Sequence, residues 1–144
     1  MSSLPELLLD PARRDQVVAA LVSTVESEVS GKSGLSGVAL KTAFKAVQKI
    51  SPDLVQRAIN GMLPDMAERL DPIWQARGDQ PFGVYLPSRA DEAADALLAV
   101  TDERAARPKH AAVAKVYNTV RPKAKAQVIE ALPAVGRTID SVLA

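Results

Sequence analysis

The sequence contains no cysteine and one histidine, and only five of its 144 residues are aromatic. Without cysteine, neither disulfide bonds nor thiolate metal sites can form. His110 has no second histidine with which to hold a metal ion, and its neighbour Lys109 disfavours a proton-accepting role in a Ser-His-Asp triad. We therefore predict no metal, no cofactor and no catalytic residue, and a protein that is not an enzyme.

Long apolar runs are also missing. No run approaches the ~20 residues that a membrane-spanning helix needs, and the start of the chain has only three consecutive leucines and no basic leader. Gly31-Lys32-Ser33 is similar to the end of a phosphate-binding P-loop, but Glu26 stands where that pattern needs its first glycine. These observations predict a cytoplasmic protein with no membrane partner and no nucleotide site.

The residues that are present describe one globular domain over 1–144. The chain is 47% apolar and 24% charged, which is typical of a soluble domain, and its length suffices for one core. Alanine is the commonest residue, with 24 occurrences, and alternation typical of a strand is absent except over 82–86. The fold class that follows is all-α.

Prolines divide the chain into helices. Several of them occupy positions where the first turn of a helix accepts proline, and Asp71 precedes one of them as an expected N-cap. Apolar residues recur at helical spacing between these prolines, as in Leu40, Phe44 and Val47. The sequence predicts a compact bundle of about eight short helices, over 11–29, 38–50, 52–61, 64–76, 88–106, 108–120, 122–131 and 133–143.

Two stretches of the chain are similar to each other. Residues 62–73 align with residues 131–142 at an offset of 69, with apolar positions matched throughout. This predicts two similar four-helix halves, 1–76 and 88–144, related by a pseudo-twofold axis and joined by an aromatic loop over 77–87. Two alternatives stay open: the similarity reflects shared composition alone, or the helices form an open stack of hairpins.

Basic residues gather in two places, while the net charge is only +1. Lysines recur every four residues in the second predicted helix, and 104–125 contains no acidic residue. This density suits contact with phosphates, although Tyr117 is the only aromatic residue there for base stacking. The alternative is a solvated face that is partly neutralised by the acidic helices of the other half or of a partner copy. The candidate anion-binding residues are Lys41, Lys45, Lys49, Lys109, Lys115, Arg121, Lys123 and Lys125.

Three of the five aromatic residues, Trp74, Phe82 and Tyr85, lie in or just before the 77–87 loop. One interpretation is that their rings fill the junction between the two halves. The other is an exposed aromatic patch that binds a partner, because tryptophan and tyrosine are favoured at interfaces.

Residues 4–11 (Leu-Pro-Glu-Leu-Leu-Leu-Asp-Pro) and 32–37 (Lys-Ser-Gly-Leu-Ser-Gly) resemble a small family of actinobacterial proteins known only as a domain of unknown function. The resemblance covers most of the chain and implies no activity. From the residues themselves we predict a non-catalytic interaction or scaffolding module that binds a protein partner or a second copy of itself. The alternative function is binding of nucleic acid or another polyanion.

Overall fold

The computed structural model describes residues 2–32, 34–107 and 110–144, and in these residues the chain forms seven helices and no strand. The all-α prediction is therefore confirmed. The helices are α1 (Leu4–Leu8), α2 (Arg14–Gly31), α3 (Gly34–Ile50), α4 (Leu54–Ala76), α5 (Phe82–Ser88), α6 (Ala90–Ala106) and α7 (Ala111–Leu143).

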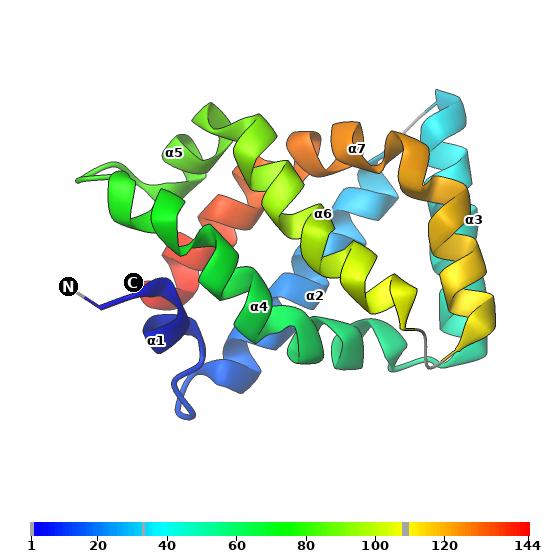
Figure 1. Cartoon of the computed structure of the whole chain (residues 1–144), viewed down its shortest axis with the longest axis horizontal. Helices are drawn as coiled ribbons and strands as arrows, with labels where there is room; N and C mark the ends of the chain where they lie inside the picture. Colours follow the sequence, from blue (N-terminus) through cyan, green and yellow to red (C-terminus); the bar gives the residue numbers. More distant parts are fainter. Residues whose placement is uncertain (1, 33, 108–109) are drawn as a thin grey trace.

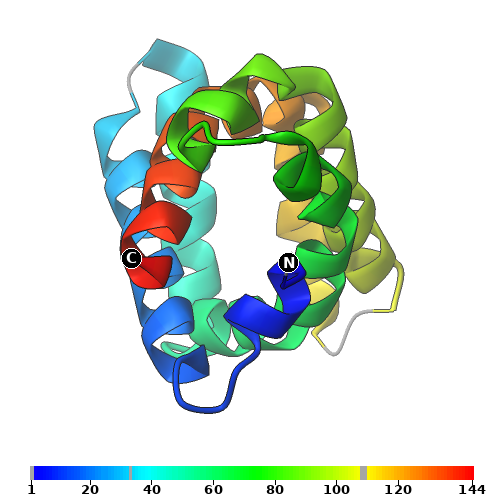
Figure 2. The same cartoon turned by 90° about the vertical axis from the view of Figure 1, so that its left-hand side faces the viewer.

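The long helices α2, α4, α6 and α7 form the body of the molecule. Helices α2 and α6 each pack against both α4 and α7. The short helices α1 and α5 lie at the end that holds both termini (Figure 1, left; Figure 2, front). At the opposite end α3 packs against the first half of α7 (Figure 1, right). The two ends of the molecule are thus built from different helices.

The main hydrophobic core lies toward the end that carries α1 and α5. It is formed by α1, α2, α4, α5, α6 and the second half of α7. Within the described part of the chain, no apolar side chain of α3 or of residues 111–127 is fully buried. The fully buried side chains of largest volume are Phe82, Leu4, Leu8, Ile73, Leu86, Leu132 and Val17.

Four prolines that the sequence analysis placed at helix starts lie inside helices, so the helix starts predicted there are wrong. One of them is Pro72, in α4. Pro64 is inside α4, and Pro122 and Pro133 are inside α7, which runs unbroken for 33 residues. A proline in a helix leaves the carbonyl four residues earlier without its usual amide donor. For Pro64 that carbonyl belongs to Asn60, and Arg14 Nη2 donates to it at 3.0 Å. The arginine thus replaces the missing backbone bond.

The expected loop over 77–87 is also wrong in its second part, because it contains α5. The pair Phe82 and Leu86 is one helical turn apart, and both side chains are fully buried. Asp140 of α7 accepts the amide of Phe82 at 2.9 Å and the amide of Gly83 at 2.8 Å. A carboxylate thus caps the first turn of α5 from another helix, as an N-cap residue would.

The equivalent position in the first half has the same role. Asp71, which aligns with Asp140, accepts the amide of Leu4 at 2.8 Å at the start of α1. Asp71 lies inside α4, so the prediction that it caps a helix of its own segment is wrong. The last helix of each half thus carries an aspartate that caps a short helix: α1 at the start of the first half, and α5 just before the second half. This shared contact supports the internal repeat, which stays a prediction.

Candidate functional site

The candidate site is the end of the molecule formed by α3 and by residues 111–125 of α7, which we call the basic end. These two segments hold seven lysines and arginines and no acidic residue, whereas the rest of the chain holds eleven lysines and arginines and seventeen acidic residues. Figure 1 shows the two segments side by side on the right of the molecule. The fold thus brings together the two basic clusters that lie more than sixty residues apart in the sequence.

Two of the seven charges are paired with carboxylates of α6. Arg121 donates from Nε to Asp102 Oδ1 at 2.8 Å and from Nη2 to Asp102 Oδ2 at 3.1 Å. Lys125 Nζ lies 3.1 Å from Asp95 and 3.4 Å from Asp91. These two pairs hold α7 against α6, which belongs to the same predicted half, whereas the sequence analysis expected the acidic residues to come from the other half or from a partner copy.

A small polar network surrounds the first of these ion pairs. The Tyr117 hydroxyl lies 2.6 Å from Asp102 and 2.7 Å from the Thr101 hydroxyl. Donation from the Arg121 guanidinium, followed by donation from Tyr117, lowers the pKa of Asp102 below its ordinary value of 3.8. Burial, followed by the neighbouring Asp102 carboxylate, raises the pKa of Tyr117 above its ordinary value of 10.0. The Tyr117 hydroxyl therefore stays protonated, and its hydrogen bonds are made within the protein, to Asp102 and Thr101.

The lowered pKa of Asp102 predicts an acid-dependent contribution to stability. The folded state favours the carboxylate, so its contribution is present above the unfolded pKa and is lost as the pH falls through the folded pKa. We expect Asp102→Asn to be slightly less stable than the wild type at pH 7, since the pair is partly exposed. Urea unfolding at several pH values checks this. The difference should shrink between about pH 5 and about pH 2, and a constant difference would contradict the assignment.

The remaining lysines of the basic end face outward. Lys45, Lys49, Lys115 and Lys123 are exposed and Lys41 is half-buried. Among the residues that the structure describes, none of these five makes an ion pair with a carboxylate. We call them the outer lysines. Their charge is available to a partner.

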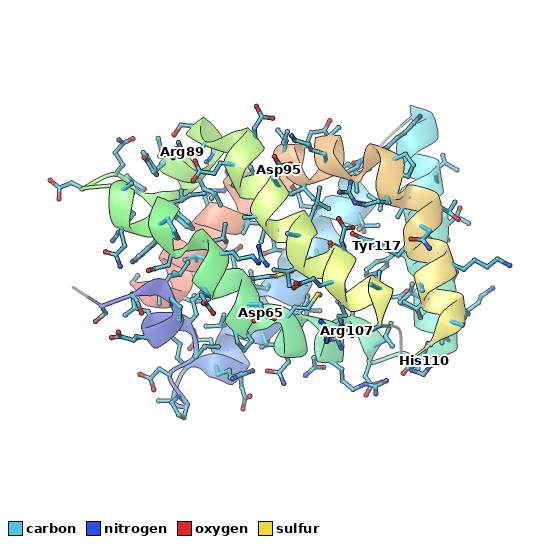
Figure 3. The ribbon with its side chains drawn as sticks, viewed as in Figure 1. Asp65, Arg89, Asp95, Arg107, His110 and Tyr117 are labelled. Carbon is cyan, nitrogen blue, oxygen red and sulfur yellow. The ribbon has the colours of Figure 1, made fainter. Side chains whose placement is uncertain are left out.

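Other residues near the start of α7 add to the positive charge of this end. Arg107 and His110 are exposed where α6 ends and α7 begins (Figure 3). The predicted site residue Lys109 lies outside the described residues. Neutral polar side chains stand between the outer lysines on the same exposed surfaces, namely Thr42, Gln48, Asn118 and Thr119. Sequence reasoning missed these four residues because no motif marks them.

The aromatic candidates lie at the other end of the molecule. Trp74 is 6% exposed and Phe82 is fully buried, with their ring centroids 5.2 Å apart and nearly perpendicular. The Arg77 guanidinium covers the tryptophan ring at 3.4 Å from its centroid. Tyr85 is half-buried, and its hydroxyl accepts from Arg89 Nη1 at 2.8 Å. The first two rings therefore fill the core and are inaccessible to a partner.

The structure places no metal-binding cluster among the described residues. An open groove of about 510 Å³ runs between α2 and α7, and the hydroxyls of Thr24 and Thr138 meet in it at 2.6 Å. Each hydroxyl also lies within hydrogen-bond distance of a carbonyl of its own helix, and since each has a single proton, one donates to its carbonyl while the other donates across the groove. Within the same described ranges, none of the helices combines the length and the apolar character that a membrane-spanning segment requires.

The chain can also be compared with known proteins. The model of a protein family described as "Family of unknown function (DUF6918)" matches residues 4–143. The chain belongs to this family. Its match covers every helix from α1 to α7, so the fold with its basic end lies within the region that defines the family. No curated protein and no solved structure matches the chain.

Proposed function

We propose that this protein is a non-catalytic interaction module that binds an anionic macromolecule on its basic end. The observation that carries the proposal is that the five outer lysines lie on two adjacent helices and, among the described residues, none of them pairs with a carboxylate. Unpaired charge of one sign on one surface raises the local concentration of a partner of the opposite sign. The cytoplasm, expected from the sequence, is the proposed compartment.

The packing of the basic end supports a binding role. None of the described residues of α3 belongs to the main core or packs against it. The outer lysines of α3 stand four residues apart, and like charges at this spacing are mildly destabilising in an isolated helix. The row of lysines therefore lowers the stability of α3, and a bound ligand of opposite charge would offset that loss.

Self-association through α3 is a second candidate function. Two apolar side chains of this helix are unusually open to solvent, with Val38 62% exposed and Ile50 39% exposed. A second copy of the chain packed on α3 would bury them. Sedimentation of the wild type and of Val38→Ser tests this candidate. It requires a dimer in the wild type that is weakened in the variant, and a monomeric wild type would exclude it.

Retention on a heparin column tests the proposed function. The triple variant Lys45→Gln, Lys49→Gln and Lys115→Gln should elute at clearly lower salt than the wild type, because three phosphate- or sulfate-binding charges are lost. The matched control is Arg57→Gln, Arg69→Gln and Arg137→Gln, which removes the same charge from exposed positions outside the basic end. The control should elute close to the wild type. Equal shifts for both variants, or no retention of the wild type, would contradict the proposal.

A further inference from the structure

We propose that the ligand of the basic end is the phosphate backbone of double-stranded DNA. This inference rests on the proposed function and names its partner. Three features favour this ligand: the spacing of the outer lysines, the polar side chains that accompany them, and the poorer fit of this surface to single-stranded nucleic acid, acidic proteins and membranes. None of these features depends on the aromatic residues at the opposite end.

The spacing of the outer lysines suits a repeating phosphate ligand. Lys41, Lys45 and Lys49 are separated by four residues each, which places them about 6 Å apart along α3. Lys115 and Lys123 form a second row about 12 Å long on α7. Packed helices lie about 8–10 Å apart, so lysines that extend from both rows can reach phosphates on the two sides of the narrow minor groove of B-form DNA.

The accompanying side chains also suit phosphate. Thr42 and Gln48 lie exposed among the lysines of α3, and Asn118 and Thr119 lie exposed between those of α7. Lysine, threonine, asparagine and glutamine are common donors to DNA phosphate oxygens, and such contacts fix position without reading sequence. We therefore expect the surface to bind duplex DNA with little dependence on base sequence.

Single-stranded nucleic acid fits this surface less well. Proteins that bind single strands stack the bases on exposed aromatic rings. Among the described residues of the basic end, the aromatic side chains are Phe44 and Tyr117, and both are only half-exposed. The hydroxyl of Tyr117 is also bonded to Thr101 and Asp102 of α6. No open platform for bases is therefore present in the described part of this end.

An acidic protein or an anionic membrane also fits less well. The centres of protein interfaces are depleted in lysine and enriched in aromatic residues, whereas lysine dominates here, and the exposed large apolar side chains in the described part of α3 are Val38 and Ile50, at the two ends of the lysine row. Helices that lie on a membrane insert a continuous face of tryptophan, phenylalanine or leucine. In α3, Leu40 and Phe44 are instead half-buried.

Fluorescence anisotropy of labelled DNA with the full chain tests the inference. For a 20-base-pair duplex, log K should fall linearly with log salt with a slope of about −4, corresponding to four or five phosphate contacts. The triple variant Lys45→Gln, Lys49→Gln and Lys115→Gln should reduce that slope by about 2.7 and weaken binding about 100-fold at about 0.15 M salt. The control Arg57→Gln, Arg69→Gln and Arg137→Gln should keep the slope of the wild type.

The same assay contains the outcomes that would overturn the inference. Equal or tighter binding of a single strand or of duplex RNA, competition by poly-L-glutamate at lower charge concentration than by duplex DNA, or equal effects of the two triple variants would each do so. Retention on heparin without binding of duplex DNA would overturn this inference and leave the proposed function standing. Failure to bind heparin and DNA alike would overturn both.

Discussion

Gly136→Ala is expected to lower the free energy of unfolding by about 3 kcal/mol, because α5 and α7 touch through their backbones at this position. A Cβ atom on residue 136 would lie 2.5 Å from the carbonyl oxygen of Phe82 and 2.6 Å from the Cα of Gly83. Real Cβ atoms do not approach backbone atoms this closely, so α5 would have to move away. That movement would also separate Asp140 from the two amides that it caps.

The natural control for this substitution is Gly31→Ala. A Cβ atom there meets nothing within 4 Å, and the position is the last residue of α2. Alanine is intrinsically the better helix former by up to about 1 kcal/mol, so this variant should be as stable as the wild type or slightly more stable. Urea unfolding of both variants checks the comparison. If Gly136→Ala is as stable as Gly31→Ala, the close contact between α5 and α7 is wrong.

Phe82→Ala and Trp74→Ala are each expected to cost about 3–5 kcal/mol, the range for large aromatic side chains removed from a core. Both rings belong to the main core, and their edge-to-face contact adds a direct interaction of about 1 kcal/mol. The double variant should therefore be destabilised by less than the sum of the single variants.

If the alanine variants do not fold, the milder variants Phe82→Leu and Trp74→Phe allow the same comparison of single and double variants. Each milder change preserves most of the apolar volume: Phe82→Leu removes the edge-to-face pair, and Trp74→Phe keeps an aromatic ring while removing part of the buried area. Chemical denaturation again provides the measurement. A near-neutral effect of Trp74→Ala would place this ring at the surface, as the partner-binding interpretation of the sequence required, and would contradict the core described above.

The helical class and the inward faces of the long helices could be predicted because they depend on local features. Helical spacing places Leu40, Phe44 and Val47 on one face of α3, and the structure turns these residues inward while lysines occupy the outer face. The helix boundaries predicted at Pro64, Pro122 and Pro133 are wrong, and for Pro64 the reason is non-local. A distant arginine, Arg14, supplies the bond that Pro64 removes, and no local pattern announces it.

The short helices were missed for a related reason. Five residues in α1 and seven in α5 are too few to show a helical period. Aspartates far away in the sequence cap the first turns of both, and Ser3 caps α1 locally by accepting from the amide of Glu6. Isolated helices of this length are unstable. Their stability therefore comes from burial and from Asp71 and Asp140. The alignment of these two aspartates was visible in the sequence, but their shared role was not.

The candidate site could be predicted in part. The spacing of Lys41, Lys45 and Lys49 and the absence of acid from 104–125 marked the two clusters. Their meeting at one end is a tertiary contact between α3 and α7, which no local signal indicates. The same holds for the carboxylates of α6 that pair with Arg121 and Lys125. Only the folded chain therefore shows which basic residues pair with carboxylates and which are outer lysines.

Lysine footprinting tests the central claim most directly, because it locates a bound anion without any substitution. The protein is acetylated with and without saturating heparin, and the rate at each lysine is read by mass spectrometry. The account predicts strong protection of Lys41, Lys45, Lys49, Lys115 and Lys123. Lys32, paired with Glu130, and Lys125, paired with α6, should change little. Equal protection of all these lysines, or none at the outer five, would contradict the claim that the basic end is the binding surface.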